Sequence, residues 1–112
     1  MEQTQTFKPF CAVYAILVKN TKVLLLKRKN QEWPEGYFSL PAGHVLDSES
    51  VKSASSRVLA EQTGAIVPPA SMKFTHVLYR KVGDRTYVDF FFEAEAEEYN
   101  DCLLYTSDAA DE

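Results

Sequence analysis

The stretch GHVLDSESVKSASSRVLAEQTG, from Gly43 to Gly64, decides how this chain folds. Its centre predicts a helix from Ser50 to Thr63, because polar residues that accept hydrogen bonds from a helix N-terminus precede it and Gly64 is a natural stop. Suitable N-cap residues are Asp47, Ser48 and Ser50. Glu49 adds negative charge where the helix dipole favours it.

One side of this helix is apolar. At about 100° per residue, four residues fall within an arc of about 80°: Val51, Ala54, Val58 and Gln62. Lys52 and Arg57 point further round, toward solvent. Taken alone, this pattern predicts an ordinary amphipathic helix that packs its apolar stripe on a sheet.

Segments on both sides of the helix are rich in β-branched and aromatic residues, as strands are. We expect strands at 10–18, 22–28, 37–40, 73–80 and 86–96, with turns at Asn20–Thr21 and Val82–Arg85. One strong helix between two hairpins predicts an α+β or an α/β/α layered domain.

Composition limits the class of protein. The chain has 112 residues, 46% hydrophobic and 25% charged, which is typical of one globular domain. The net charge of -4 includes no basic stripe, which argues against nucleic acid as a partner. No apolar run approaches the roughly 20 residues that span a bilayer, so we expect a cytoplasmic protein without a membrane partner. The sequence does not indicate the oligomeric state, and Cys11 is expected to be a buried free thiol.

The last residues differ in character from the rest. The segment CLLYTSDAADE, residues 102–112, has no helix start signal and no strand pattern, and it resembles one reading frame of a transposase sequencing adapter. We therefore expect a single domain over residues 1–101 and a non-native tail over 102–112.

A frame of spaced residues distinguishes the quoted stretch from an ordinary helix. Gly43 is followed by Glu49, Arg57, Glu61 and Gly64 at intervals of six, eight, four and three. This spacing, continued to Ala65 and preceded by YFSLPAGHV, resembles the box of the Nudix hydrolases, G-x5-E-x7-R-E-U-x-E-E-x-G-U, in which U is a bulky apolar residue. The strand order expected here is also similar to the order of that family.

The resemblance implies a fold and an activity. The fold would be a Nudix-type α/β/α sandwich with a mixed sheet, here lacking the C-terminal helix, since nothing after Asp101 would supply one. The activity would be cleavage of a diphosphate bond in a nucleoside diphosphate derivative or a nucleoside triphosphate, with Mg²⁺ or Mn²⁺ as cofactor. Carboxylates on one helix face can bridge such cations to substrate phosphates, and the metal activates the attacking water.

The resemblance also implies roles for individual residues. Glu49, Arg57 and Glu61 would be catalytic residues of the box. Metal ligands would be Glu61, Gln62 and the backbone carbonyl of Ala42.

The box is incomplete at two positions. Val58 and Gln62 stand where the family has glutamates, so the metal is expected to bind weakly. Arg57 is also expected to lose the residue with which it would pair.

Residues outside the box are weaker candidates. Arg28 ends the second strand, where it could meet phosphates, and Trp33 could stack on a base, so both are expected to bind substrate. Asp89, Glu93 and Glu95 lie where some relatives place an extra acid, but we favour solvated strand residues for all three.

Two functions remain open. The chain is either a Nudix-type hydrolase, impaired by Val58 and Gln62, or a catalytically inactive nucleotide-binding or regulatory domain. Similarity to the family favours the hydrolase.

Overall fold

Strands form most of the described chain, which comprises residues 6–27 and 38–95 of this computed structural model. The first strands are β1 (Phe10–Lys19), β2 (Lys22–Val23), β3 (Leu26–Lys27), β4 (Phe38–Ser39) and β5 (Ala42–His44). They are followed by helix α1 (Val51–Thr63), the 3-10 helix η1 (Pro69–Ser71), and strands β6 (Lys73–Val82) and β7 (Arg85–Glu95). The tail expected at 102–112 lies outside the described residues.

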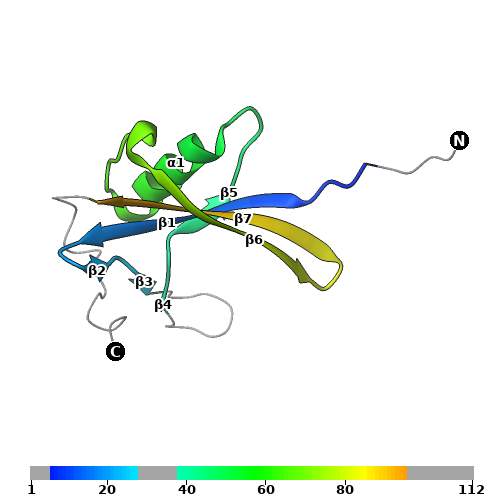
Figure 1. Ribbon diagram of the computed structural model, residues 1–112, viewed down its shortest axis with the longest axis horizontal. Coiled ribbons are helices and arrows are strands. Elements are labelled where there is room, and N and C mark those ends of the chain that lie inside the picture. Colours follow the sequence, from blue (N-terminus) through cyan, green and yellow to red (C-terminus); the bar gives the residue numbers. More distant parts are fainter. Residues whose placement is uncertain (1–5, 28–37, 96–112) are drawn as a thin grey trace, which may run out of the picture.

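The main sheet is mixed, as the sequence predicts. Its strands lie in the order β2-β1-β7-β6, and β5 also pairs with β1 (Figure 1). The central strands β1 and β7 are parallel, whereas the other pairs of this sheet are antiparallel. Strands β3 and β4 form a separate two-stranded sheet.

Helix α1 covers one face of the main sheet (Figure 1). Side chains alternate along a strand, so residues two apart share a face. On β1 and β7 the residues buried in the core are Val13, Ala15, Leu17, Phe92 and Ala94. On α1 they are Ala54, Val58 and Leu59. One layer of helix on one face of the sheet thus builds the described core.

The predicted helix is confirmed almost to the residue. Ser50 is the N-cap, and its Oγ accepts a hydrogen bond from the Ser53 amide at 3.0 Å. Gly64 ends α1 with a φ of 84°, a left-handed conformation that glycine adopts without strain, and its amide donates to the Ala60 carbonyl at 2.9 Å. These caps fix the box at both ends.

The turns follow the predicted hairpins. Asn20 and Thr21 connect β1 to β2 with φ values of 53° and 64°, as a two-residue hairpin turn with twisted strands requires. Gly83 and Asp84 connect β6 to β7. The expectation of a buried Cys11 is wrong, because this free thiol near the start of β1 is exposed.

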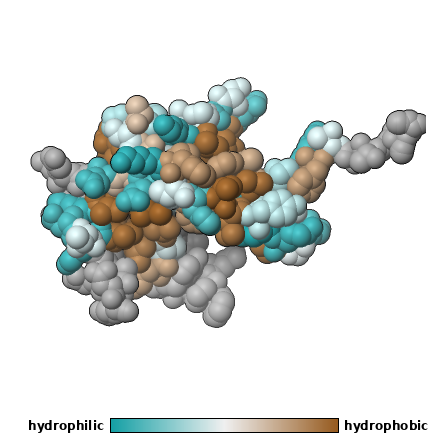
Figure 2. Space-filling model, viewed as in Figure 1, coloured by the Kyte–Doolittle hydropathy of each residue, from teal (hydrophilic) through white to brown (hydrophobic). Residues whose placement is uncertain are grey.

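Strand β6 lies at an edge of the main sheet and is exposed along almost its whole length. Its exposed apolar residues are Phe74, Val77, Leu78, Tyr79 and Val82. Figure 2 shows hydrophobic surface over the region where β6 crosses β7. None of the helices in the described ranges has the length and apolar character needed to cross a membrane.

Candidate functional site

Arg57 is the centre of the polar contacts around α1. Its Nε donates to Glu49 Oε2 at 2.7 Å, and its Nη2 donates to Glu49 Oε1 at 3.1 Å. Nη1 donates to Glu61 Oε1 at 3.1 Å, and Nη2 also donates to the His44 carbonyl at 2.8 Å. The expectation that Arg57 loses its partner is therefore wrong, since two carboxylates of the box accept its hydrogen bonds. One guanidinium joins β5, the loop before α1 and the last turn of α1.

Glu49 is held from two sides. Besides the Arg57 contacts, its Oε1 accepts a hydrogen bond from the Leu46 amide at 2.9 Å. The hydrogen bond from Arg57, and after it the one from Leu46, lower the pKa of Glu49 below its ordinary value. The hydrogen bond between Arg57 and Glu49 also raises the pKa of Arg57. Glu49 is therefore an ionised anchor for the loop before α1.

This anchor predicts a specific acid sensitivity. Because the pKa of Glu49 in the folded chain lies below its ordinary 4.5, the stability it contributes is present above the unfolded-state pKa. That stability is lost as the pH falls through the folded-state pKa. Between about pH 5 and pH 3, a Glu49→Gln variant should lose less stability than the parent chain.

Thermal melts over this pH range measure the difference. Asp47→Asn, a substitution of an exposed acid in the same loop, serves as the control and should follow the parent. Parallel pH profiles for the parent and Glu49→Gln would contradict the prediction.

Gln62 and Ala42 lie side by side and bind each other. The Gln62 Nε2 donates to the Ala42 carbonyl at 2.7 Å, and the Ala42 amide donates to Gln62 Oε1 at 3.2 Å. One side-chain amide thus satisfies both backbone groups of Ala42. Two of the three residues that the resemblance assigns to a metal are thus close together, and each is the other's hydrogen-bond partner.

Val58, which stands where the family has a glutamate, lies in apolar surroundings. Its side chain is 1% exposed and belongs to the core beneath α1. A Cβ atom on Gly43 would lie 2.9 Å from Val58 Cγ2, closer than side-chain atoms approach, so this position on β5 requires glycine. Strand β5 and helix α1 are therefore packed directly on each other at Val58.

Glu61 is more exposed to solvent than Glu49, the other carboxylate that Arg57 binds. Its side chain is 59% exposed, against 15% for Glu49. The Arg57 hydrogen bond is made by Oε1, so the carboxylate remains accessible from solvent. No group of three or more His, Cys, Asp or Glu residues within 6–27 and 38–95 is placed to hold a metal ion.

Asp89 is not a solvated strand residue, and that expectation is wrong. It is 1% exposed, and its Oδ2 accepts a hydrogen bond from Arg80 Nε in an ion pair. Arg80 Nη2 also lies 3.4 Å from the Tyr14 hydroxyl, and the guanidinium lies 4.3 Å from the centre of the Tyr87 ring. The hydrogen bond to Asp89 raises the pKa of Arg80. A part-buried charged cluster thus lies in the sheet, outside the box.

The sequence alone does not predict this cluster, although the hairpin turn contains a signal for it. A two-residue turn at Gly83 and Asp84 sets the register of the hairpin, so that Arg80 pairs with Tyr87 and Leu78 pairs with Asp89. Arg80 and Asp89 are then diagonal neighbours on one sheet face, within reach of a long side chain.

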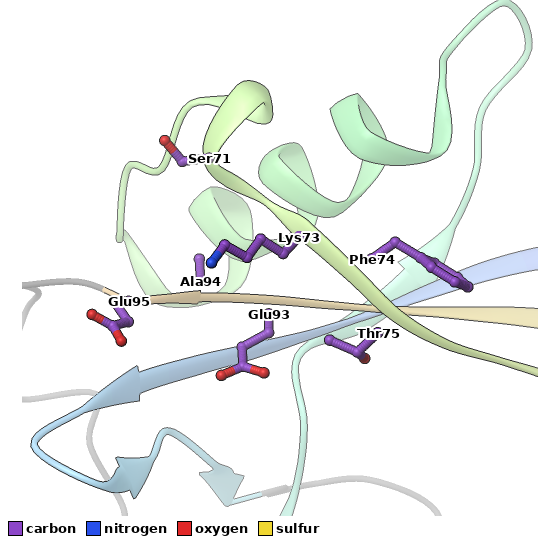
Figure 3. A pocket seen from close by; sticks show the side chains of 7 residues that line it. All are labelled: Ser71, Lys73, Phe74, Thr75, Glu93, Ala94 and Glu95. Carbon is purple, nitrogen blue, oxygen red and sulfur yellow. The ribbon is translucent and has the colours of Figure 1, made fainter.

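Glu93 and Glu95 line a hollow of about 510 Å³ next to β6. The full lining is Ser71, Lys73, Phe74, Thr75, Glu93, Ala94 and Glu95. Figure 3 shows the Lys73 side chain on one side of β7 and the carboxylates of Glu93 and Glu95 on the other. The hollow includes no residue of the box and does not gather its charged groups around one point.

The two substrate-binding candidates, Arg28 and Trp33, lie outside the described residues. Their roles stay predictions. The described site therefore consists of the Arg57 network, the Gln62–Ala42 pair and the apolar contact of Val58.

Comparison with known proteins shows to which family this fold and site belong. The NUDIX domain family matches residues 8–107. The fold and the box define the class: the chain belongs to the NUDIX family. An ADP-ribose pyrophosphatase of Methanocaldococcus jannaschii is 45% identical over 58 residues, which are 52% of this chain and 34% of that protein. The chain thus matches about a third of the length of that curated relative.

Solved structures agree on the fold. A MutT/nudix family protein from Enterococcus faecalis superposes with a TM-score of 0.72 at 24% identity, over 89% of this chain and 42% of that chain. The NUDIX domain of Shewanella oneidensis NrtR, complexed with ADP ribose, has a TM-score of 0.66 at 23% identity, over 83% of this chain and 64% of that chain. At these identities the likeness establishes the α/β fold with a mixed sheet.

Proposed function

We propose that this chain binds a nucleoside diphosphate linked to another group, such as ADP-ribose, and hydrolyses the diphosphate bond slowly. The observation that carries the proposal is the Arg57 network, which keeps Glu49 and Glu61 in one cluster on the loop and helix of the box. The ADP-ribose pyrophosphatase of M. jannaschii supports the substrate class. The ADP-ribose complex of the S. oneidensis NUDIX domain supports the same class.

Slow hydrolysis follows from the donors that the box offers. Mg²⁺ requires about six oxygen ligands in near-octahedral geometry, usually with carboxylates among them. Val58 has no lone pair. The Gln62 side-chain oxygen accepts a hydrogen bond from the Ala42 N–H, and the Ala42 carbonyl oxygen accepts one from Gln62 Nε2. Of the residues that the resemblance assigns to the metal, Glu61 is the one with a carboxylate, and this carboxylate is exposed. These donors do not fit a tightly held Mg²⁺.

The Gln62–Ala42 pair favours a second candidate function. If the box no longer supports hydrolysis at all, the chain is a binding or regulatory domain for the same class of ligand. The two candidates differ in one observable: the second binds ADP-ribose without cleaving it.

The test measures ADP-ribose binding by calorimetry and AMP release by chromatography, with Mg²⁺ or Mn²⁺ present. Cleavage by water would give AMP and ribose 5-phosphate. We expect binding by the parent chain and AMP release above the buffer rate. Glu61→Gln keeps the shape of the side chain but removes its charge, and it should lower AMP release at least ~10-fold with binding retained.

Asp84→Asn is the matched control, because it removes a carboxylate from the β6–β7 turn, outside the box. It should release AMP at the parent rate. Binding without AMP release in the parent would establish the second candidate. An absence of binding to ADP-ribose and to other nucleoside diphosphate derivatives would refute both.

A further inference from the structure

The bridge between Gln62 and Ala42 joins the end of the box helix to the residue just before the box, twenty positions earlier in the sequence. Gln62 is in the last turn of α1, and Ala42 begins β5, which pairs with β1 in the main sheet. Both hydrogen bonds are part-buried. The bridge therefore holds the C-terminal end of the helix against the strand that leads into the loop.

The bridge depends on an amide. An amide has a donor and an acceptor, so Gln62 can satisfy the carbonyl and the N–H of one residue at once. A carboxylate in the same place could accept from the Ala42 N–H. It would, however, place a charged oxygen where Nε2 now lies, 2.7 Å from the Ala42 carbonyl oxygen. Two oxygens this close repel each other unless a cation lies between them.

We propose that the Gln62 amide takes the place of a divalent cation in this box, so that the helix and β5 keep their arrangement without metal. The side-chain atom next to the Ala42 carbonyl oxygen distinguishes the state without metal from the state with metal. If this atom is the Gln62 nitrogen, both hydrogen bonds form. If it is a glutamate oxygen, a cation is required between the two oxygens. The inference concerns the site of the proposed function, but it does not require that the chain bind or cleave a nucleotide.

Val58 strengthens the inference independently. Next to the bridge, Val58 fills the space against Gly43 with apolar atoms. These two contacts between α1 and β5, one polar and one apolar, include no charged group that needs a counter-ion, and they lie beside the Arg57 hydrogen bond to the His44 carbonyl of β5. Glu61, the exposed carboxylate beside Gln62, is already paired with Arg57.

The experiment compares melting temperatures in EDTA and in millimolar Mg²⁺ or Mn²⁺, without nucleotide. The parent should melt at the same temperature in both. Gln62→Glu should melt roughly 5–10 °C lower in EDTA, as expected in a small domain when the hydrogen bond to the Ala42 carbonyl is lost and oxygen–oxygen repulsion replaces it, and should recover most of this with metal. The recovery follows because a ligand that binds only the folded state stabilises it.

Gln62→Met is the matched control, because it keeps the length of the side chain but can neither bridge nor bind a hard cation. It should melt lower than the parent by a similar amount, with and without metal. A parent chain whose melting temperature rises by several degrees with Mg²⁺ would overturn the proposal, and this measurement needs no variant. A Gln62→Glu variant with the parent's melting temperature in EDTA would also overturn it.

Discussion

Val58→Glu should lower the free energy of unfolding by about 3–5 kcal/mol, which is the range for an uncompensated charge in a protein interior. The site is 1% exposed, belongs to the core under α1 and contacts Gly43 directly. A carboxylate there would lose its water without gaining a partner. Urea unfolding followed by circular dichroism measures the change.

The same substitution at Val51 is the control. Val51 is the first residue of α1 and is half-buried, and a helix N-terminus favours negative charge, so Val51→Glu should have a much smaller effect. If Val58→Glu were as stable as the parent and released AMP faster from ADP-ribose, the position would be an open ligand site. The present packing interpretation would then be wrong. Because Val58 is packed in the core, we expect that Val58→Glu alone does not restore the family's box.

Asp89→Ala should also have a large effect, about 3 kcal/mol, because it leaves Arg80 without its ionic partner. We take the low end of the range since the Arg80 side chain is 34% exposed and can be hydrated. Arg80→Met should be destabilising as well, because it leaves the buried Asp89 carboxylate unpaired. The double variant Asp89→Leu, Arg80→Met should lose less than the two single variants together, since neither charge remains.

Activity distinguishes a structural from a catalytic role for Asp89. If the cluster only supports the sheet, Asp89→Ala should bind ADP-ribose and release AMP like the parent at temperatures where it is folded. Full stability combined with loss of AMP release would instead identify Asp89 as the extra acid that some relatives have.

The sequence predicts local structure here better than tertiary contacts. The caps of α1 and the two hairpins follow from short-range rules, because Ser50, Gly64 and the turn residues act on backbone atoms a few positions away. Helical periodicity placed Gln62 on the apolar side, where it is half-buried, but it could not show that Ala42 is its partner. Periodicity likewise predicts that Arg57 faces solvent, because it cannot show how the loop before α1 folds back. That loop brings Glu49 to Arg57.

The burial of Asp89 in the sheet is a second tertiary feature that the sequence alone does not predict. An acid in a strand is usually exposed, and the alternation of β7 does not by itself show that Arg80 covers this one. The pairing follows only when the register of the hairpin is combined with the length of the arginine side chain.

The parallel pair at the centre of the sheet also limits when this chain can fold. Strand β1 spans Phe10–Lys19 and its partner β7 spans Arg85–Glu95, so the pairing closes a loop of most of the domain. Contacts between residues so distant in sequence form slowly, because the chain loses loop entropy before they are made. During synthesis, β1 must wait until β7 has left the ribosome. Until then the apolar residues of β1 have no partner on that side, which makes this interval the one in which a growing chain is most exposed to misassociation.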